Sequence, residues 1–144
     1  MKTEHFALRS FTLAALSATL TFCLGLLPAL HAATSCVNPG GTEGCYSRIQ
    51  SAVDAAGSGD TIHVGTGIYS EAVTIDKPLT LHANGTANIQ GCFSMTADNV
   101  TVDGFLFNGG GSCPSAGEKS AIYMAANTEG HTIIGNPLNG PGAT

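Results

Sequence analysis

Two histidines are the first residues in this sequence whose type and spacing could do chemistry. His63 and His82 occupy the same place in two Thr-x-His triplets, which begin at Thr61 and Thr80. Imidazole pairs can bind transition metals, but protein sites for zinc use at least three side-chain ligands, and no third donor recurs with this pair. The pattern therefore predicts stacked, solvated histidines, no metal ligands and no cofactor.

The four cysteines beyond residue 32 carry the second chemical signal: Cys36, Cys45, Cys92 and Cys113. An even count in an exported chain of this size favours disulfides. The sequence has no CxxC pair, the spacing that would indicate a zinc site. Four cysteines allow three pairings. We favour Cys36 with Cys45, which closes a small loop, and Cys92 with Cys113, which lie 21 residues apart. Free buried thiols are the alternative.

The other candidate acids and bases belong to no catalytic motif. Asp98 and Asp103 flank one predicted strand, and we predict that both are turn or surface acids. The sequence contains no GxSxG elbow, no P-loop and no HExxH motif. It therefore identifies no catalytic and no cofactor-binding residue, and it leaves enzymatic activity an open question.

The N-terminal residues have the layout of a secretory signal. Met1 to Arg9 carries two bases and one acid, Phe11 to Leu27 carries no charge, and Pro28 breaks the run. We predict a signal peptide over residues 1–32, cleaved after Ala32 or within the next three residues. A membrane anchor is the rival interpretation, but the run is shorter than the roughly 20 apolar residues of a spanning helix. The predicted location is extracellular or periplasmic, with no membrane association after cleavage.

Charge narrows the range of partners. Removing residues 1–32 takes Lys2, Arg9 and Glu4 away and leaves 112 residues with three bases and nine acids. Phosphate backbones are bound by clustered Lys and Arg, so we expect no nucleic-acid partner. A polyanionic ligand would need calcium or a local basic patch.

One helix and a series of short strands are predicted after an N-terminal loop. Residues 33–45 are rich in Gly, Asn and Pro and are predicted to form the loop. Tyr46 to Ala56 has apolar residues at helical spacing, with Ser47 as N-cap and Gly57 as the stop. The predicted strands are Thr61 to Val64, Ala72 to Ile75, Leu79 to Ala83, Val100 to Phe107, Ala121 to Ala125 and Thr132 to Ile134.

The strands repeat. Triplets that begin with Thr and a branched apolar residue recur at Thr61, Thr80, Thr101 and Thr132, with gaps of 19, 21 and 31 residues. The longest gap contains a Gly- and Ser-rich loop, Asn108 to Glu118. Such a period predicts an all-β solenoid of about four coils over residues 46–135, in which each strand pairs in parallel with its equivalent one coil away. The amphipathic helix would cap the first coil, and residues 136–144 would form a disordered tail. Two explanations for the uncovered last coil stay open: the protein is truncated or fragmentary, or another chain covers this coil.

Four motifs follow one another in order: IQSAVDAA at 49–56, GDTIHV at 59–64, GIYSE at 67–71 and KPLTL at 77–81. Together they resemble the opening of pectin-lyase-like right-handed parallel β-helix proteins, over about residues 47–135. The resemblance implies right-handed coils. It also implies structural roles for Tyr69, whose ring would pack at a corner, and for Glu71, whose carboxylate would bind turn amides.

The resemblance permits pectin de-esterification, pectate elimination or galacturonan hydrolysis, but the residues for each are missing. Esterases of this type need paired Asp and Gln on later coils, lyases need an Arg base near an acid cluster, and hydrolases need two or three close carboxylates. Arg48, on the predicted helix, is the sole Arg after residue 32. We therefore predict a secreted, non-catalytic β-helix module, a piece of a longer protein, that binds polysaccharide or cell-envelope glycan and can self-associate through its uncapped last coil. The alternative is a polysaccharide-active enzyme without its later catalytic coils.

Overall fold

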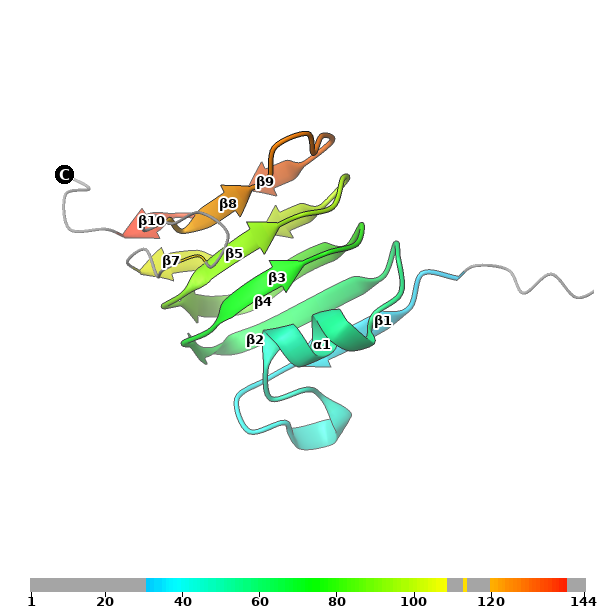
Figure 1. Ribbon diagram of the computed structural model, residues 1–144. Coiled ribbons are helices and arrows are strands. Elements are labelled where there is room, and N and C mark those ends of the chain that lie inside the picture. Colours follow the sequence, from blue (N-terminus) through cyan, green and yellow to red (C-terminus); the bar gives the residue numbers. More distant parts are fainter. Residues whose placement is uncertain (1–30, 109–112, 114–119, 140–144) are drawn as a thin grey trace, which may run out of the picture. The chain divides into compact units, whose positions relative to one another are not determined.

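The structure is a computed structural model that describes residues 31–108, 113 and 120–139. It is mostly β, with strands lying in successive layers and one short helix beside the first layers (Figure 1). Nearly all of the predicted signal peptide and most of the predicted loop Asn108 to Glu118 lie outside the described residues. Within the described ranges, no helix has the length and apolar character needed to span a membrane.

The elements follow one another along the chain without any long helix between strands. They are β1 (Thr34–Val37), the 3-10 helix η1 (Thr42–Gly44), α1 (Ile49–Ala55), β2 (Thr61–Tyr69), β3 (Ala72–Ile75), β4 (Thr80–Ile89), β5 (Cys92–Met95), β6 (Thr101–Asp103), β7 (Leu106–Asn108), β8 (Ile122–Met124), β9 (Thr132–Ile134) and β10 (Leu138–Asn139).

Every described strand pairing is parallel. The larger sheet runs β1-β2-β4-β6-β9, with β7 beside β4 and β10 beside β7, and the smaller sheet runs β3-β5-β8. Thr61 pairs with Thr80, Thr80 with Thr101, and Thr101 with Thr132. The four Thr-containing triplets of the sequence therefore align strand on strand, as their spacing predicts.

The core lies between the two sheets. Along β2, β4 and β6 buried and half-buried residues alternate, so that Ile62, Leu81 and Val102 point inward and are fully buried. Phe93 and Phe105 belong to the same core. Their rings contact each other edge to face, with 5.2 Å between ring centroids. Burial of this apolar column is the main stabilising term of the fold.

The segment before the helix differs from the prediction. The sequence predicts a loop over residues 33–45, but Thr34–Val37 forms β1 and Thr42–Gly44 forms η1. β1 pairs with β2 from Thr34 opposite Thr61 onward, so the edge of the larger sheet supplies its hydrogen bonds. Local composition does not reveal such a tertiary partner.

The helix is shorter than predicted. It covers Ile49–Ala55 instead of Tyr46 to Ala56, and the predicted N-cap Ser47 is wrong, because Arg48 is the N-cap residue and makes no side-chain capping bond. Its buried residues confirm the predicted apolar face; they are Ile49, Ala52 and Val53.

The strand predictions hold best over short runs rich in β-branched residues. Ala72 to Ile75 and Thr132 to Ile134 are confirmed as β3 and β9. β5 was missed because all four of its residues are buried and show no alternation. The tail expected to be disordered contains β10 within its described part, residues 136–139, and β10 pairs with β7.

Close turns explain why the predicted strand Val100 to Phe107 is interrupted. It divides into β6 and β7 at Gly104, whose φ of +82 favours glycine. Asn136, from the next layer, accepts a hydrogen bond from the Phe105 N–H at 2.8 Å and donates one to the Val102 carbonyl at 2.8 Å. One carboxamide therefore holds the turn of the layer below it.

Candidate functional site

The outer face of the larger sheet presents its side chains in columns. Because strands pair in register, residues of successive layers that point outward stand one above another. Thr61, Thr80, Thr101 and Thr132 form one column. His63, His82 and Asp103 are in register in the column beside it, and we call these three the histidine column.

The two histidines touch. Their ring centroids are 5.6 Å apart with the ring planes perpendicular, so the imidazoles meet edge to face. His82 Nδ1 also lies 3.0 Å from Asp103 Oδ2. The side chains of His82 and Asp103 are 43% and 36% exposed, so the column is open to solvent. The triplet pattern that pairs the histidines also contains Asp103, which holds the same third place in the triplet at Thr101 but was predicted only as a turn or surface acid.

The histidine column is short of metal ligands. Cys36 is in register with His63, but its sulfur is bonded to Cys45. No group of three or more His, Cys, Asp or Glu side chains in the part of the chain that the structure describes is placed to hold a metal ion.

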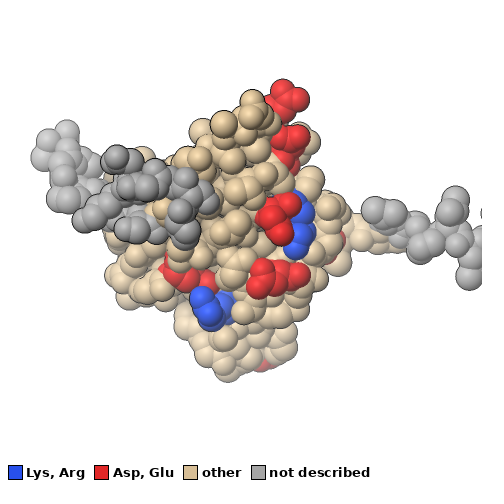
Figure 2. Space-filling view, viewed as in Figure 1, with Lys and Arg blue, Asp and Glu red and all other residues tan. Residues whose placement is uncertain are grey.

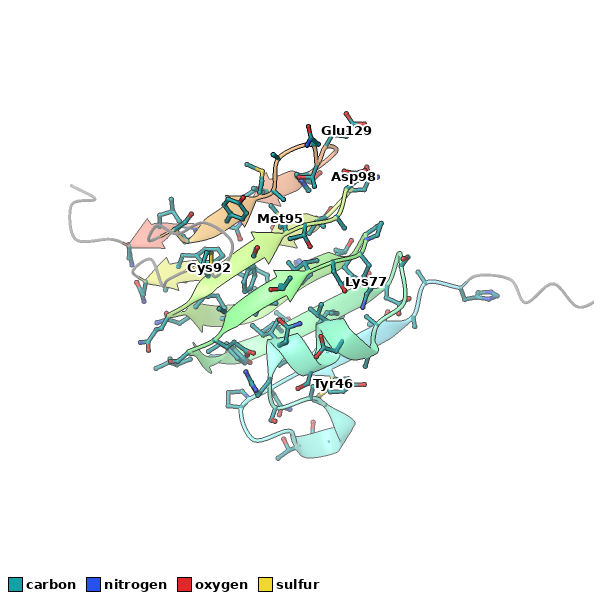
Figure 3. The ribbon with its side chains drawn as sticks, in the orientation of Figure 1. Tyr46, Lys77, Cys92, Met95, Asp98 and Glu129 are labelled. Carbon is teal, nitrogen blue, oxygen red and sulfur yellow. A yellow bond between two sulfur atoms is a disulfide. The ribbon has the colours of Figure 1, made fainter. Side chains whose placement is uncertain are left out.

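The favoured disulfides are both present. Cys36 is bonded to Cys45, with 4.8 Å between Cα atoms, and Cys92 to Cys113, with 5.6 Å. The first ties β1 to the segment that leads into α1. The second joins Cys92, which begins β5 and is labelled in Figure 3, to Cys113, which precedes β8.

The other candidate acid and base make structural contacts. Asp98 Oδ1 accepts a hydrogen bond from the Glu129 N–H at 2.9 Å, and both residues lie at the same turn end of the strands (Figure 3). Arg48 Nε lies 3.6 Å from Glu71 Oε2. These contacts occupy Asp98 and Arg48 at separate places, with no shared reaction centre.

Glu71 caps the helix from outside it. Its side chain is 7% exposed, and its carboxylate oxygens accept hydrogen bonds from the backbone N–H groups of Ile49, at 2.8 Å, and Gln50, at 3.2 Å. The first amides of a helix have no partner within the helix, and a negative charge there is favourable. The resemblance gave Glu71 a role at turn amides, and the structure places it at helix amides.

Gln50 and Lys77 join the same helix to β3. The Gln50 carboxamide accepts a hydrogen bond from the Thr74 N–H at 2.7 Å and donates one to the Thr74 carbonyl at 3.3 Å. Lys77 Nζ donates to the Val53 carbonyl at 3.0 Å. Gln50 thus makes the two hydrogen bonds that a neighbouring strand would make, and α1 covers the edge of β3.

Tyr69 lies under this helix-capping contact. Its ring is buried, and its hydroxyl donates a hydrogen bond to the Gly65 carbonyl at 2.9 Å. Burial, and then the negative charge of Glu71, raises the pKa of the Tyr69 phenol. The ring therefore stays neutral and packed at this corner.

The last layer has no comparable cover among the described residues. Its strands β8, β9 and β10 lie at the end opposite α1 (Figure 1). They expose large apolar side chains to solvent: Met124 at 51%, Ile133 at 42%, Ile134 at 57% and Leu138 at 59%. We call these three strands, with their exposed apolar side chains, the open end.

Charged groups are sparse, and bases stand beside acids. The described residues include two bases after the start of β1, Arg48 beside Glu71 and Lys77 beside Asp76, the latter pair 3.3 Å apart. Figure 2 shows the basic atoms next to acidic ones on the face in view. No basic patch of the kind that binds nucleic acid forms on that face.

Comparison with known proteins gives one partial match. A protein named "Cell surface glycoprotein" from Methanothermus fervidus is 35% identical over 105 residues, an alignment that covers 67% of this chain and 16% of the relative. The chain therefore spans about one sixth of that relative's length. Comparison with models of protein families and with solved structures gives no match.

Proposed function

We propose that this chain is a non-catalytic module of an exported, cell-surface protein. It is built as a right-handed parallel β-helix of the pectin-lyase-like type, with α1 as the cap of its first coil. The observation that carries the proposal is that each candidate catalytic side chain except the histidine column is engaged in holding a layer, a turn or the helix.

Register and covering contacts support the proposed architecture. Parallel pairing of equivalent residues from β2 to β9 stacks the inward side chains, as a solenoid requires. The hydrogen bonds from Gln50 to β3 protect an edge that would otherwise recruit other strands, which is what a cap does.

Two observations support the proposed location. Disulfides persist in oxidising compartments outside the cytosol, and this chain has two. The relative's name describes a surface protein, and its much greater length fits a module that forms part of a longer chain.

The ligand that we propose is a neutral or weakly charged polysaccharide of the cell envelope. The threonine and histidine columns offer hydroxyl and imidazole groups on one face, which can bond sugar hydroxyls. The scarcity of bases argues against a strongly acidic glycan unless calcium bridges it.

Export and catalysis can be tested together. The full chain is expressed with its own leader, the cell is fractionated, and the N-terminus of the product is sequenced. We expect a surface or medium fraction that begins at Ala33 to Cys36 and gives no unsaturated product, methanol or reducing ends from pectin or pectate, with or without calcium. Cytosolic retention would refute export, and activity lost on Asp98→Ala or Asp103→Ala would refute the non-catalytic assignment.

Glycan binding has its own measurement. Affinity electrophoresis of the wild-type protein in gels that contain envelope polysaccharide should show retardation, and a Thr80→Ala/Thr101→Ala variant should migrate faster. The matched control, Thr42→Ala, removes an exposed threonine from η1, away from the column. Equal retardation of all three proteins would rule out the threonine column as the binding face.

A further inference from the structure

The histidine column contains a carboxylate–imidazole pair that bonding to sugar hydroxyls does not require. Asp103 Oδ2 lies 3.0 Å from His82 Nδ1, and an ionised carboxylate can only accept a hydrogen bond. In neutral His82 the proton therefore stays on Nδ1, which leaves the lone pair on Nε2.

This arrangement is the one that metal-binding histidines use. A ligating imidazole usually donates its other N–H to a carboxylate, which fixes the tautomer and the ring orientation. The carboxylate that does this in other sites is not a ligand itself. Asp103 is placed to act on His82 in the same way.

A second imidazole stands directly beside the first. His63 is one strand away in register, and the ring centroids are 5.6 Å apart. Two nitrogens bound to one ion at about 2.0–2.1 Å each lie roughly 3 Å apart. The rings already touch, so the proposed chelate requires the His63 ring to turn, with His82 held on Asp103, until one nitrogen of each ring reaches that separation.

We propose that His63 and His82 chelate one borderline divalent cation, with Asp103 as the positioning residue and water in the remaining coordination places. Imidazole pairs favour Cu²⁺, then Ni²⁺ and Zn²⁺, over Ca²⁺ and Mg²⁺, which prefer oxygen ligands. With two protein ligands the site is open and exchangeable, and it lies beyond the proposed surface-module role.

His131 supplies a matched control. Its Nε2 lies 2.9 Å from Thr128 Oγ1, at a turn away from the histidine column. His131→Asn removes an imidazole without touching the proposed chelate.

Untagged, exported protein is freed of metal and titrated with Cu²⁺ by calorimetry, and the bound ion is examined by electron paramagnetic resonance. We expect one Cu²⁺ per chain with splitting from two imidazole nitrogens. His63→Asn and His82→Asn should each leave at most one nitrogen and lose the stoichiometric binding. His131→Asn should bind as wild type does, with circular dichroism confirming that each variant is folded.

Asp103 is tested by two variants. Asp103→Ala should weaken Cu²⁺ binding roughly 10- to 100-fold while both nitrogens remain in the spectrum, and Asp103→Asn, which keeps an acceptor oxygen, should recover part of the loss. Equal binding in wild type and His63→Asn, or equal losses in His63→Asn and His131→Asn, would show adventitious metal only. A loss of one nitrogen in Asp103→Ala would overturn its positioning role.

Discussion

The two ends of the strand stack are finished in opposite ways. At the first end α1 lies against β3: Glu71 and Lys77 bind backbone groups of α1, and the Gln50 side chain of α1 binds the backbone of β3. At the open end β8, β9 and β10 expose Met124, Ile134 and Leu138, and their outer edges pair with no other described strand. Both ends have the same kind of strand, so the difference lies in what covers them.

The comparison shows that a sheet edge can be closed by one side chain in place of a strand. A strand edge needs a donor and an acceptor at each paired residue, and the Gln50 carboxamide brings one of each to Thr74. A helix can therefore occupy the position of a strand without leaving Thr74 unpaired. Four predictions test this contrast, the largest effect first.

Glu71→Ala should have the largest effect on the covered end. It leaves two helix N–H groups and Arg48 without their carboxylate, in a place where the Glu71 side chain is almost fully buried. We expect the free energy of unfolding in urea to fall by about 2–4 kcal/mol. Asp76→Ala, which removes an exposed acid from the turn after β3, should change it by less than about 0.5 kcal/mol. Equal effects of the two variants would show that Glu71 is not a cap.

Gln50→Ala should come next, because it uncovers the edge of β3. The loss of two hydrogen bonds to Thr74 should cost about 1–2 kcal/mol in urea unfolding. Thioflavin binding or light scattering should also rise, since a free edge recruits other strands. Gln90→Ala removes a carboxamide that bonds an exposed serine and serves as the control. If Gln50→Ala stays soluble and fully stable, α1 does not protect the edge.

Tyr69→Phe should show its effect mainly at alkaline pH. The pKa of this phenol is raised in the folded chain, so the folded state holds the proton more tightly than the unfolded state. The resulting stabilisation is complete below about pH 10 and is lost as the pH rises through the folded-state pKa. Urea midpoints of the wild type should therefore fall above about pH 10, and Tyr69→Phe should remove that component.

At neutral pH Tyr69→Phe should cost about 1 kcal/mol, from the hydrogen bond to Gly65. Tyr123→Phe, at β8 near the open end, should keep the wild-type dependence on pH. Parallel pH curves for wild type and Tyr69→Phe would contradict the assignment.

Charging the open end should have the smallest effect on stability. We expect wild-type protein to self-associate through Met124 and Leu138, which are half exposed or more. Met124→Lys/Leu138→Lys should abolish the concentration dependence of sedimentation and change the unfolding free energy by less than about 0.5 kcal/mol. Ile68→Lys charges an equally exposed apolar residue on β2 and should leave association unchanged. Association that persists in the double variant would place the contact elsewhere.

The sequence predicted those features that depend on periodicity. Strand spacing gave the parallel register of Thr61, Thr80 and Thr101, and cysteine spacing gave both disulfides. Local runs of β-branched residues also located β3 and β9. These features can be predicted because the spacing or the type of the residues along the chain indicates each of them.

Features that depend on a distant partner were not predictable. Nothing local to residues 34–37 shows that β2 will accept them as a strand, and nothing near Ser47 shows that Glu71 will replace it as the cap. Such contacts are made between layers, and a pattern within one layer does not contain them.

The carboxamide of Asn136 makes the turn after β6 depend on the layer that follows it. The turn after β6 has its Phe105 amide and Val102 carbonyl bound by a residue that arrives about thirty positions later in synthesis. A growing chain would therefore hold that turn unfinished until the following segment emerges and docks. We expect this turn to become fixed only when the segment between β9 and β10, which carries Asn136, has docked.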